Sequence, residues 1–448
     1  MHSSTSISLY TLLLTLTLAF TTFTTTTATP PPPQPPPPRQ KTCDAEIDCG
    51  AVPDGRTLSS AALSACVLVC DTITFATNAV FLVSSIDISN TRSLTLDFSD
   101  NSGLIATTNI SSYPIAPFFP PMGSTSCYRS VIFGRNVSNL LIRGPTTAVI
   151  DGQGAMWQPL RPTLPHQAPK MLELVDAINV TVQGLTFLNS ANWHIHLVFA
   201  SNIRMINNTV LGNRSWGGTD GIDPHGSTDV IIEGAHIDVG DDAIAVTSGA
   251  HDITGVLYPA KRVHVLNSYL RSRNFAIGSG TFANVSDVVV EDTRIGDDEG
   301  SAPWAIKIKT HCPFGGVVSN ITFQRLRLGA ISPNSYQQPN AGYALAIYEN
   351  YGGGCGKDTN ITALGPSPFA LTAIHNITFK DIIGTSAVWA SNPLEGVELP
   401  GGANVTNLHF ENVSFGNVSA AQPWICRGVV NTSVVGMVQP PLPTTCGI

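Results

Sequence analysis

Three aspartates lie in two short motifs that are 21 residues apart. Asp220 belongs to the run Gly-Thr-Asp-Gly-Ile-Asp at 218–223, and Asp241 and Asp242 belong to Val-Gly-Asp-Asp-Ala-Ile-Ala at 239–245. This interval is about one coil of a parallel β-helix, in which neighbouring strands lie about 4.8 Å apart. Stacking of two coils would bring the three carboxylates into one patch. Carboxylates held together in this way supply the acid and the base that hydrolyse a sugar bond.

A short repeated pattern predicts the strands that would position these aspartates. Each copy begins with a polar turn residue, and alternating apolar and polar residues follow. From Asn179 to Asn320 successive copies lie 23 to 33 residues apart. Alternation with a period of two predicts strands, and the spacing predicts stacked repeats. Asn and Asp suit these starts because they tolerate tight turns. The copies begin at Ser93, Asn139, Asn179, Asn202, Asp229, Arg262, Asp287, Asn320 and Asn376.

The repeats predict an all-β chain that forms one parallel β-helix. A two-sheet sandwich is the rival fold, but it would need shorter strand spacing and hairpin turns. The chain has 448 residues, of which 43% are hydrophobic and only 12% are charged, and this composition suits extended structure. Its length would allow two or three domains, but solenoids run long as one unit. A capping helix is expected around Leu58 to Val69.

The N-terminal segment has the features of an export signal. Leu9 to Phe20 is apolar but interrupted by threonine, and it is too short to span a bilayer. Pro30 to Pro38 contains one Gln and is typical of a semi-rigid spacer. We therefore expect a signal peptide over 1–28, a Pro-rich linker over 29–42 and a β-helix domain over 43–448, with no membrane attachment after signal removal. A disordered tail without an export role is the alternative.

Cysteines and glycosylation sequons indicate a secreted protein of the extracellular space or cell wall. Four of the nine cysteines cluster within 43–70, and Cys426 and Cys446 lie near the end, so disulfides are expected at both ends of the solenoid. The odd count leaves at least one thiol without a partner in the chain. Several sequons open the strand pattern, where turn chemistry is the alternative to glycan attachment. Sequons occur at Asn109, Asn136, Asn179, Asn320, Asn376 and Asn404.

The charge of the chain excludes one class of partner. The formal net charge is −8, the sequence pI is about 5.7 and no basic run occurs, so nucleic-acid binding is not expected. No metal site and no cofactor are expected, and we expect a monomer.

Further motifs resemble the polygalacturonase family of pectin-cleaving hydrolases, glycoside hydrolase family 28, most closely its plant-type branch. Residues 48–55 (Asp-Cys-Gly-Ala-Val-Pro-Asp-Gly) resemble the opening strand and turn of that family. Ile-Asp-Gly-Gln-Gly at 150–154, followed by Trp157, resembles its Asp-Gly-Gln-Gly-x-x-Trp element, and Trp-His-Ile-His at 193–196 resembles its Trp-x-x-His run. The likeness extends from about Cys49 to the C-terminus. It implies a right-handed parallel β-helix that cleaves α-1,4-linked galacturonic acid in pectic or other uronate-rich polysaccharides, with inversion and without a metal.

The resemblance also implies roles for the aspartates. Asp220 corresponds to the Asp of the family's Asn-Thr-Asp motif, and Asp241 and Asp242 correspond to its Gly-Asp-Asp motif. Asp241 is then the general acid, and Asp220 and Asp242 are the general base and the water holder. An inverting enzyme needs its two carboxyl groups roughly 6.5–9.5 Å apart to admit water. Without the resemblance, these aspartates would equally fit turn positions or a calcium site.

Lysines are expected to bind the polyanionic substrate. Lys307 and Lys309 are two residues apart, so on a strand both would emerge on one face. Two solvated surface lysines are the alternative. Lys307 replaces the arginine of the family's Arg-Ile-Lys motif, which keeps the charge but loses the bidentate fork. One of Tyr348 and Tyr351 is expected to contact a sugar, and Tyr351 is the predicted binding residue.

Two further departures from the family pattern concern the aspartates. The stretch 272–274 (Ser-Arg-Asn) stands where the family has Gly-His-Gly, so the supporting histidine is missing and Arg273 is the candidate contact to the aspartates or the substrate. Gly218 stands where the family has the Asn of Asn-Thr-Asp. These changes leave open a decorated pectin, an exo-acting enzyme or another uronate polymer. They also leave open two other functions, a β-helix polysaccharide lyase and an inactive wall-binding protein.

Other polar residues near the motifs are interpreted as structural. Asp223 lies three positions after Asp220, and odd spacings on a strand face opposite sides, so it is expected to face away from the cleft. His225 is interpreted as a surface turn histidine, and a place on the rim of the cleft is the alternative. Trp193, His194 and His196 are interpreted as packing residues that support the site.

Overall fold

The structure is a computed structural model. It describes residues 40–118, 126–250, 256–299, 303–311, 315–331, 342–351, 372–384, 391–396, 405–416, 418, 420 and 422–448. The predicted signal peptide over 1–28, most of the predicted linker over 29–42, and Asn404 lie outside the described residues. The boundary predicted at residue 43 lies within the first strand, Gln40–Asp44.

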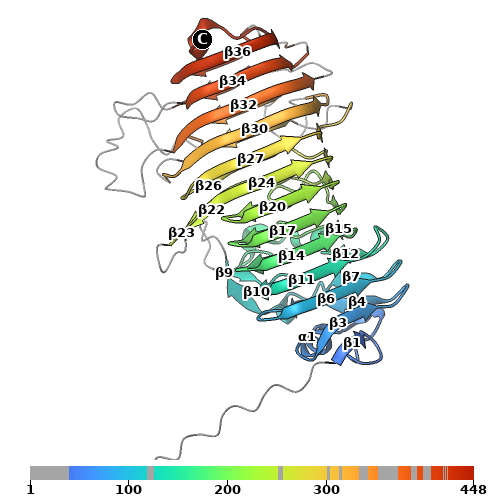
Figure 1. The fold of residues 1–448 in the computed structure, drawn as a ribbon. Helices are drawn as coiled ribbons and strands as arrows, with labels where there is room; N and C mark the ends of the chain where they lie inside the picture. Colours follow the sequence, from blue (N-terminus) through green and yellow to red (C-terminus); the bar gives the residue numbers. More distant parts are fainter. Residues whose placement is uncertain are drawn as a thin grey trace, which may run out of the picture. The chain divides into compact units, whose positions relative to one another are not determined.

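The described strands stack in coils and form three ladders of parallel strands, as the repeat predicts (Figure 1). The first ladder contains β1 Gln40–Asp44, β3 Cys70–Phe75, β6 Arg92–Phe98, β11 Ser138–Arg143, β14 Ile178–Gln183, β17 Ser201–Ile206, β20 Thr228–Glu233, β24 Ala260–Leu266, β27 Val285–Glu291, β30 Val317–Leu328, β32 Ala373–Gly384, β34 Val405–Ser414 and β36 Val429–Gln439.

The second ladder joins the first at β30, because the later coils carry long strands in place of two short ones. It contains β2 Asp54–Leu58, β4 Val80–Val83, β7 Gly103–Ala106, β12 Val149–Asp151, β15 Thr186–Leu188, β18 Thr209–Leu211, β21 His236–Asp238, β25 Tyr269–Leu270 and β28 Arg294–Ile295.

The third ladder carries the strands that follow the aspartate motifs. It contains β5 Ile86–Asp87, β10 Ile132–Arg135, β13 Leu172–Val175, β16 Ile195–Val198, β19 Ile222–His225, β22 Ile244–Ala250, β26 Phe275–Thr281, β29 Trp304–Lys309, β31 Tyr343–Tyr348, β33 Asn392–Glu395 and β35 Trp424–Arg427. The fold is thus the predicted right-handed parallel β-helix.

Short elements complete the coils. Two strands, β8 Ile115–Pro117 and β9 Ser126–Tyr128, form an antiparallel pair, and β23 Leu257–Tyr258 pairs antiparallel with β22. The helical segments are α1 Ser60–Val67, α2 Gly154–Trp157, η1 Ile110–Ser112, η2 Arg161–Thr163 and η4 Thr444–Cys446. The expected capping helix is α1, which lies within the range Leu58 to Val69. Among the described residues, no helix has both the length and the apolar character needed to cross a membrane.

The residue that begins each repeat adopts a left-handed backbone conformation. All nine of the starts predicted from the sequence have positive φ, between 54° at Asn139 and 64° at Ser93. Short polar side chains tolerate this conformation because they hydrogen-bond locally. This explains why Asn and Asp recur at these positions.

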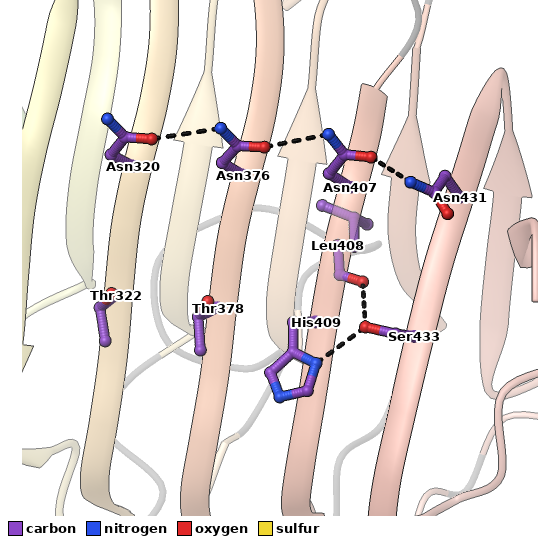
Figure 2. Close-up of a pocket in the computed structure, with 9 residues that line it drawn as sticks. All are labelled: Asn320, Thr322, Asn376, Thr378, Asn407, Leu408, His409, Asn431 and Ser433. Carbon is purple, nitrogen blue, oxygen red and sulfur yellow. Dashed lines mark hydrogen bonds between the residues drawn. The ribbon is translucent and has the colours of Figure 1, made fainter.

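The side chains of these asparagines also bond from coil to coil. The Asn376 amide nitrogen donates to the Asn320 oxygen at 3.2 Å, and Asn407 donates to Asn376 at 3.0 Å. Figure 2 shows this ladder, which continues to Asn431. The amide nitrogen of Asn179 also donates to a neighbouring asparagine. The sequon asparagines Asn179, Asn320 and Asn376 thus each have a positive φ and a side-chain bond to a neighbouring coil, as the alternative of turn chemistry predicts.

The ends of the solenoid carry disulfides at the expected places. Near the start Cys43 bonds to Cys70 and Cys49 bonds to Cys66, and near the end Cys426 bonds to Cys446. Among the described cysteines, Cys127 is free and buried.

Stacked apolar side chains fill the interior between the ladders. Phe323, Phe379 and Phe410 pair in register on successive coils, with ring centroids 5.4 Å and 5.0 Å apart, and all three are fully buried. The register that aligns the core therefore aligns the outward side chains of the same coils as well.

We predict that Phe379→Ala lowers the free energy of unfolding by roughly 3–5 kcal/mol, because it leaves a cavity between two stacked rings. Ile383→Ala on the same strand is the matched control, because Ile383 is 60% exposed. We expect the control to change stability by less than about 0.5 kcal/mol. Chemical denaturation measures both, and an equal loss in the two variants would contradict the stacked core.

Candidate active site

The outer face of the third ladder forms the floor of a cleft with a volume of about 310 Å³. Ile222 of β19 points into the core, whereas Asp223 and His225 of the same strand line the cleft. Their neighbours in register are His196 on β16 and Thr247 on β22. The lining residues are Trp193, His196, Gly218, Asp220, Asp223, His225, Asp241, Asp242, Ala245, Thr247, Arg273, Gly278, Ser279, Gly280, Lys309 and Tyr351.

The structure brings the three predicted aspartates together in this cleft. Asp220 lies two residues before β19, and Asp241 and Asp242 lie just before β22. Backbone hydrogen bonds fix the two turns side by side, because the Gly221 amide donates to the Asp242 carbonyl at 2.9 Å. The predicted stacking of the two motifs on adjacent coils is confirmed.

Asp241 accepts a hydrogen bond on each carboxylate oxygen. Its Oδ2 accepts from the Gly218 amide at 2.6 Å and its Oδ1 accepts from the Asp242 amide at 3.1 Å. The Arg273 guanidinium forms an ion pair with Oδ1 at 3.2 Å. Arg273 therefore contacts a catalytic candidate from the position where the family pattern has histidine. Burial and the charge of Asp242 raise the pKa of Asp241, and the charge of Arg273 and the hydrogen bond from the Gly218 amide oppose this rise.

Asp242 forms a buried ion pair with Lys309. The Lys309 Nζ lies 2.6 Å from Asp242 Oδ2, and both side chains are largely excluded from solvent. Burial lowers the pKa of Lys309, but the charge and the hydrogen bond of Asp242 outweigh it, so the pKa lies above its ordinary value.

Asp220 is the carboxyl group most exposed to the negative charge of its neighbours. Burial raises its pKa well above the ordinary value, and the charges of Asp223, Asp241 and Asp242 raise it further. A carboxyl group that stays protonated beside ionised partners is what acid/base catalysis by paired carboxylates requires. The cleft can thus hold one or more protons at mildly acidic pH.

Two lysines and several aromatic rings lie near β29, two coils after β22. Lys307 and Lys309 emerge on one face of β29, as predicted, but Lys307 is 4% exposed and is not a solvated surface lysine. Its Nζ lies 4.0 Å from the ring centre of Trp304 and 4.7 Å from that of Tyr351. Tyr351 lines the cleft, whereas the ring of Tyr348 packs near Tyr343.

Two of the predictions about neighbouring residues are wrong. Asp223 does not face away from Asp220, because β19 begins only at Ile222 and the alternation of a strand does not extend back into the turn. Both carboxylate oxygens of Asp223 are buried, with no hydrogen-bond partner among the described residues. His225 is not a surface turn residue. It lies within β19, is 2% exposed and bonds to Thr247 at 2.6 Å.

The interpretation of the Trp-His-Ile-His run as supporting residues is partly right. His194 is fully buried and contacts the Asp220 carbonyl through Nδ1 at 2.9 Å, so it supports the aspartate turn. Trp193 and His196 line the cleft. His196 Nδ1 lies 3.2 Å from Glu173 Oε1, and Glu173 is also paired with the buried Lys170. Burial lowers the pKa of His196 to about 4, so this histidine is neutral near pH 6.

Sequence reasoning missed Arg161, which reaches the aspartate turn from η2. Its Nη1 donates to the Gly217 carbonyl at 2.5 Å. A single arginine in a segment rich in proline carries no pattern of its own. The one signal in the sequence is indirect, because Gly218 leaves room for a side chain from another segment.

The fold and the carboxylate cleft are those of a β-helical glycoside hydrolase, and comparison with known proteins gives the family. Residues 51–434 match the model of glycosyl hydrolases family 28. The chain therefore belongs to this family and is a glycoside hydrolase.

Individual relatives agree with this assignment. A probable polygalacturonase of Vitis vinifera is 28% identical over 422 residues, which cover 89% of this chain and 79% of that protein. Polygalacturonase QRT2 of Arabidopsis thaliana is 26% identical over 58% of this chain and 54% of its own. Among solved structures, an exopolygalacturonase from Thermotoga maritima has a TM-score of 0.67 at 19% identity, over 86% of this chain and 89% of its own. At this identity the structural likeness shows the fold alone.

We predict that Lys309→Met lowers the free energy of unfolding by roughly 3–5 kcal/mol, because it leaves the buried Asp242 without its cation. The double variant Lys309→Met/Asp242→Leu should recover a large part of that loss. Arg262→Met is the control, because the Arg262–Asp229 pair is about half exposed and should cost less than about 1 kcal/mol. Urea denaturation measures all three. A double variant less stable than Lys309→Met would contradict the paired-charge account.

Proposed function

We propose that this chain is a secreted polygalacturonase-like enzyme that hydrolyses α-1,4-galacturonosidic bonds of pectin with inversion. The observation that carries the proposal is the cleft itself, in which three carboxylates from two adjacent coils lie beside Lys309, with Lys307 two residues before it on β29. Acid/base hydrolysis needs the carboxylates, and an anionic polymer needs the cations. The names of the relatives agree with this substrate class.

In the proposed reaction Asp241 protonates the leaving oxygen, and Asp220 and Asp242 hold and activate the water on the opposite face of the sugar. The assignment of Asp241 as the acid follows the resemblance of its Gly-Asp-Asp motif, and the contacts from Arg273 and the Gly218 amide hold its carboxylate in place. The ion pair with Lys309 orients Asp242 within the cleft. The proton that leaves water passes to the base carboxylate, and the proton of the acid passes to the leaving sugar, so the two carboxyl groups exchange their states in each turnover.

Secretion is a part of the same proposal. The apolar N-terminal segment, the disulfides at both ends of the solenoid and the sequons support it. The chain is proposed to act as a monomer on wall polysaccharide.

The central prediction is that the purified protein releases reducing ends from de-esterified pectin. Asp241→Asn, Asp220→Asn and Asp242→Asn should each lower kcat by at least about 100-fold, since general acid–base catalysis contributes roughly 10²–10⁴-fold. Asp229→Asn, on the exposed side of the first ladder, is the matched control and should keep wild-type activity. Reducing-sugar release with product sizing measures the effect.

Three results would contradict the proposed function. An unsaturated product detected by its ultraviolet absorbance would indicate a lyase. Saturable pectin binding without a product at any pH would indicate a binding protein. Normal turnover by Asp241→Asn would refute the assignment of the acid.

The buried Lys307 gives a prediction about the pH dependence of binding. Burial and the charge of Lys309 lower the pKa of Lys307 to about 8, so this lysine is protonated below that pH and neutral above it. Affinity for a galacturonate oligomer should therefore fall as the pH rises through about 8. Calorimetric titration of the Asp241→Asn protein prevents turnover during the measurement.

The Lys307→Met variant separates this effect from others. It should bind roughly tenfold more weakly at pH 6, in keeping with the worth of a hydrogen bond to a charged group. It should also lack the change near pH 8. Lys380→Met is the control, because Lys380 lies on the first ladder and pairs there with Glu411. An unchanged pH dependence in Lys307→Met would show that another group binds the carboxylate.

A further inference from the structure

One peptide unit connects Arg161 to Asp241. Arg161 Nη1 donates to the Gly217 carbonyl at 2.5 Å, and the Gly218 amide donates to Asp241 Oδ2 at 2.6 Å. The carbonyl and the amide belong to the same peptide bond, which is planar, so fixing one end fixes the direction of the other. The guanidinium therefore orients the N–H that holds the carboxylate.

We propose that Arg161 is a positioning residue of the active site, which acts on Asp241 through the Gly217–Gly218 peptide and requires glycine at position 218. This inference rests on the proposed role of Asp241 in hydrolysis. Arg161 comes from η2, a segment far from the aspartate motifs in the sequence, and its contact is made to the backbone of the turn and not to the carboxylate itself.

The geometry at Gly218 explains the need for glycine. Gly218 has a φ of +66°, a conformation that disfavours most side chains. A Cβ at this position would lie 2.8 Å from Arg161 Nη2 and 3.6 Å from its Nη1. Any side chain at 218 would thus displace the guanidinium. This contact gives a physical reason for glycine where the motif of the family has Asn.

Arg161 and Arg273 hold Asp241 from two sides. Arg273 approaches Oδ1, while the peptide that Arg161 orients donates to Oδ2. Chains of hydrogen bonds polarise one another, so the cation on the Gly217 carbonyl strengthens the bond from the Gly218 amide. The charged groups around Asp241 are the cations Arg161, Arg273, Lys307 and Lys309 and the carboxyl groups Asp220, Asp223 and Asp242.

Loss of Arg161 therefore has a defined effect on the pH profile. Removing a cation and loosening a donor both disfavour the ionised form of Asp241, so its pKa rises. If Asp241 must be protonated to act as the acid, the alkaline limb of kcat moves to higher pH. At the optimum kcat falls, because the carboxylate is less well oriented, whereas KM changes little because Arg161 acts through the turn.

The test compares Arg161→Gln, Gly218→Asn and the double variant. Asn is chosen at 218 because it tolerates positive φ better than other side chains. Each single variant should lower kcat on de-esterified pectin by roughly 10- to 100-fold, as a small misplacement of a catalytic group does, and should move the alkaline limb upward with KM within about twofold. The kcat of the double variant should be no lower than that of the less active single variant, because both changes break the same contact.

Two further variants complete the comparison. Arg161→Lys keeps the charge and one donor and should recover part of kcat. Arg143→Gln is the control, because Arg143 is paired with Asp97 on the outside of the first ladder and should leave the profile unchanged.

Several outcomes would overturn the inference. A wild-type profile in Arg161→Gln would do so, as would a change in KM alone, which would make Arg161 a substrate contact. If the two losses in kcat multiply in the double variant, Arg161 and Gly218 have separate structural roles. The same conclusion follows if kcat falls together with the unfolding midpoint while the alkaline limb of the pH profile stays in place.

A second readout keeps this inference separate from the proposed function. Titration of aspartate carboxyl carbons by nuclear magnetic resonance gives the pKa of Asp241 in the wild type and in Arg161→Gln without any turnover. A higher value in the variant supports the relay even if the wild type does not cleave pectin, and equal values refute it.

Discussion

The parallel register between successive coils is the constraint on which the rest of the structure depends. A backbone hydrogen bond from Gly221 to the Asp242 carbonyl sets two turns side by side, although 21 residues separate Asp220 from Asp241. The same ladder aligns the stacked rings of the core and the outward residues of the cleft floor. Apolar stacking and active-site geometry are therefore two results of one hydrogen-bond pattern, and a shift of register would disturb both.

The three aspartates of the cleft differ in the groups that surround them. Asp242 is paired directly with the buried Lys309, and Asp241 is held by a guanidinium and a backbone amide. Asp220 is surrounded by other carboxyl groups, which together with burial keep its pKa high. Groups of the same chemical type thus have different charges and hydrogen-bond donors around them, although they lie within one cleft.

Two positions that depart from the family pattern contribute to the surroundings of Asp241. Arg273 occupies the place of the missing histidine and still contacts Asp241, while Gly218 makes room for Arg161. Both arginines add positive charge beside the aspartates of a chain whose net charge is −8. The result is positive charge beside the aspartates, which would offset the repulsion between the protein and the polyanionic substrate of the proposed function.

The solenoid and the meeting of the aspartates could be predicted from the amino-acid sequence, because alternation with a period of two and the coil spacing are local properties of the chain. The sequence also identified the residues that take positive φ, since Asn and Asp are the side chains that tolerate that conformation. The residues that line the cleft beside the aspartates could not be predicted in the same way, because they depend on packing between coils. Asp223 and His225 were misplaced because the start of β19 is set by pairing with its neighbours, and Arg161 was missed because its contact joins segments 56 residues apart. Contacts of that kind depend on three-dimensional packing and leave no periodic trace in the chain.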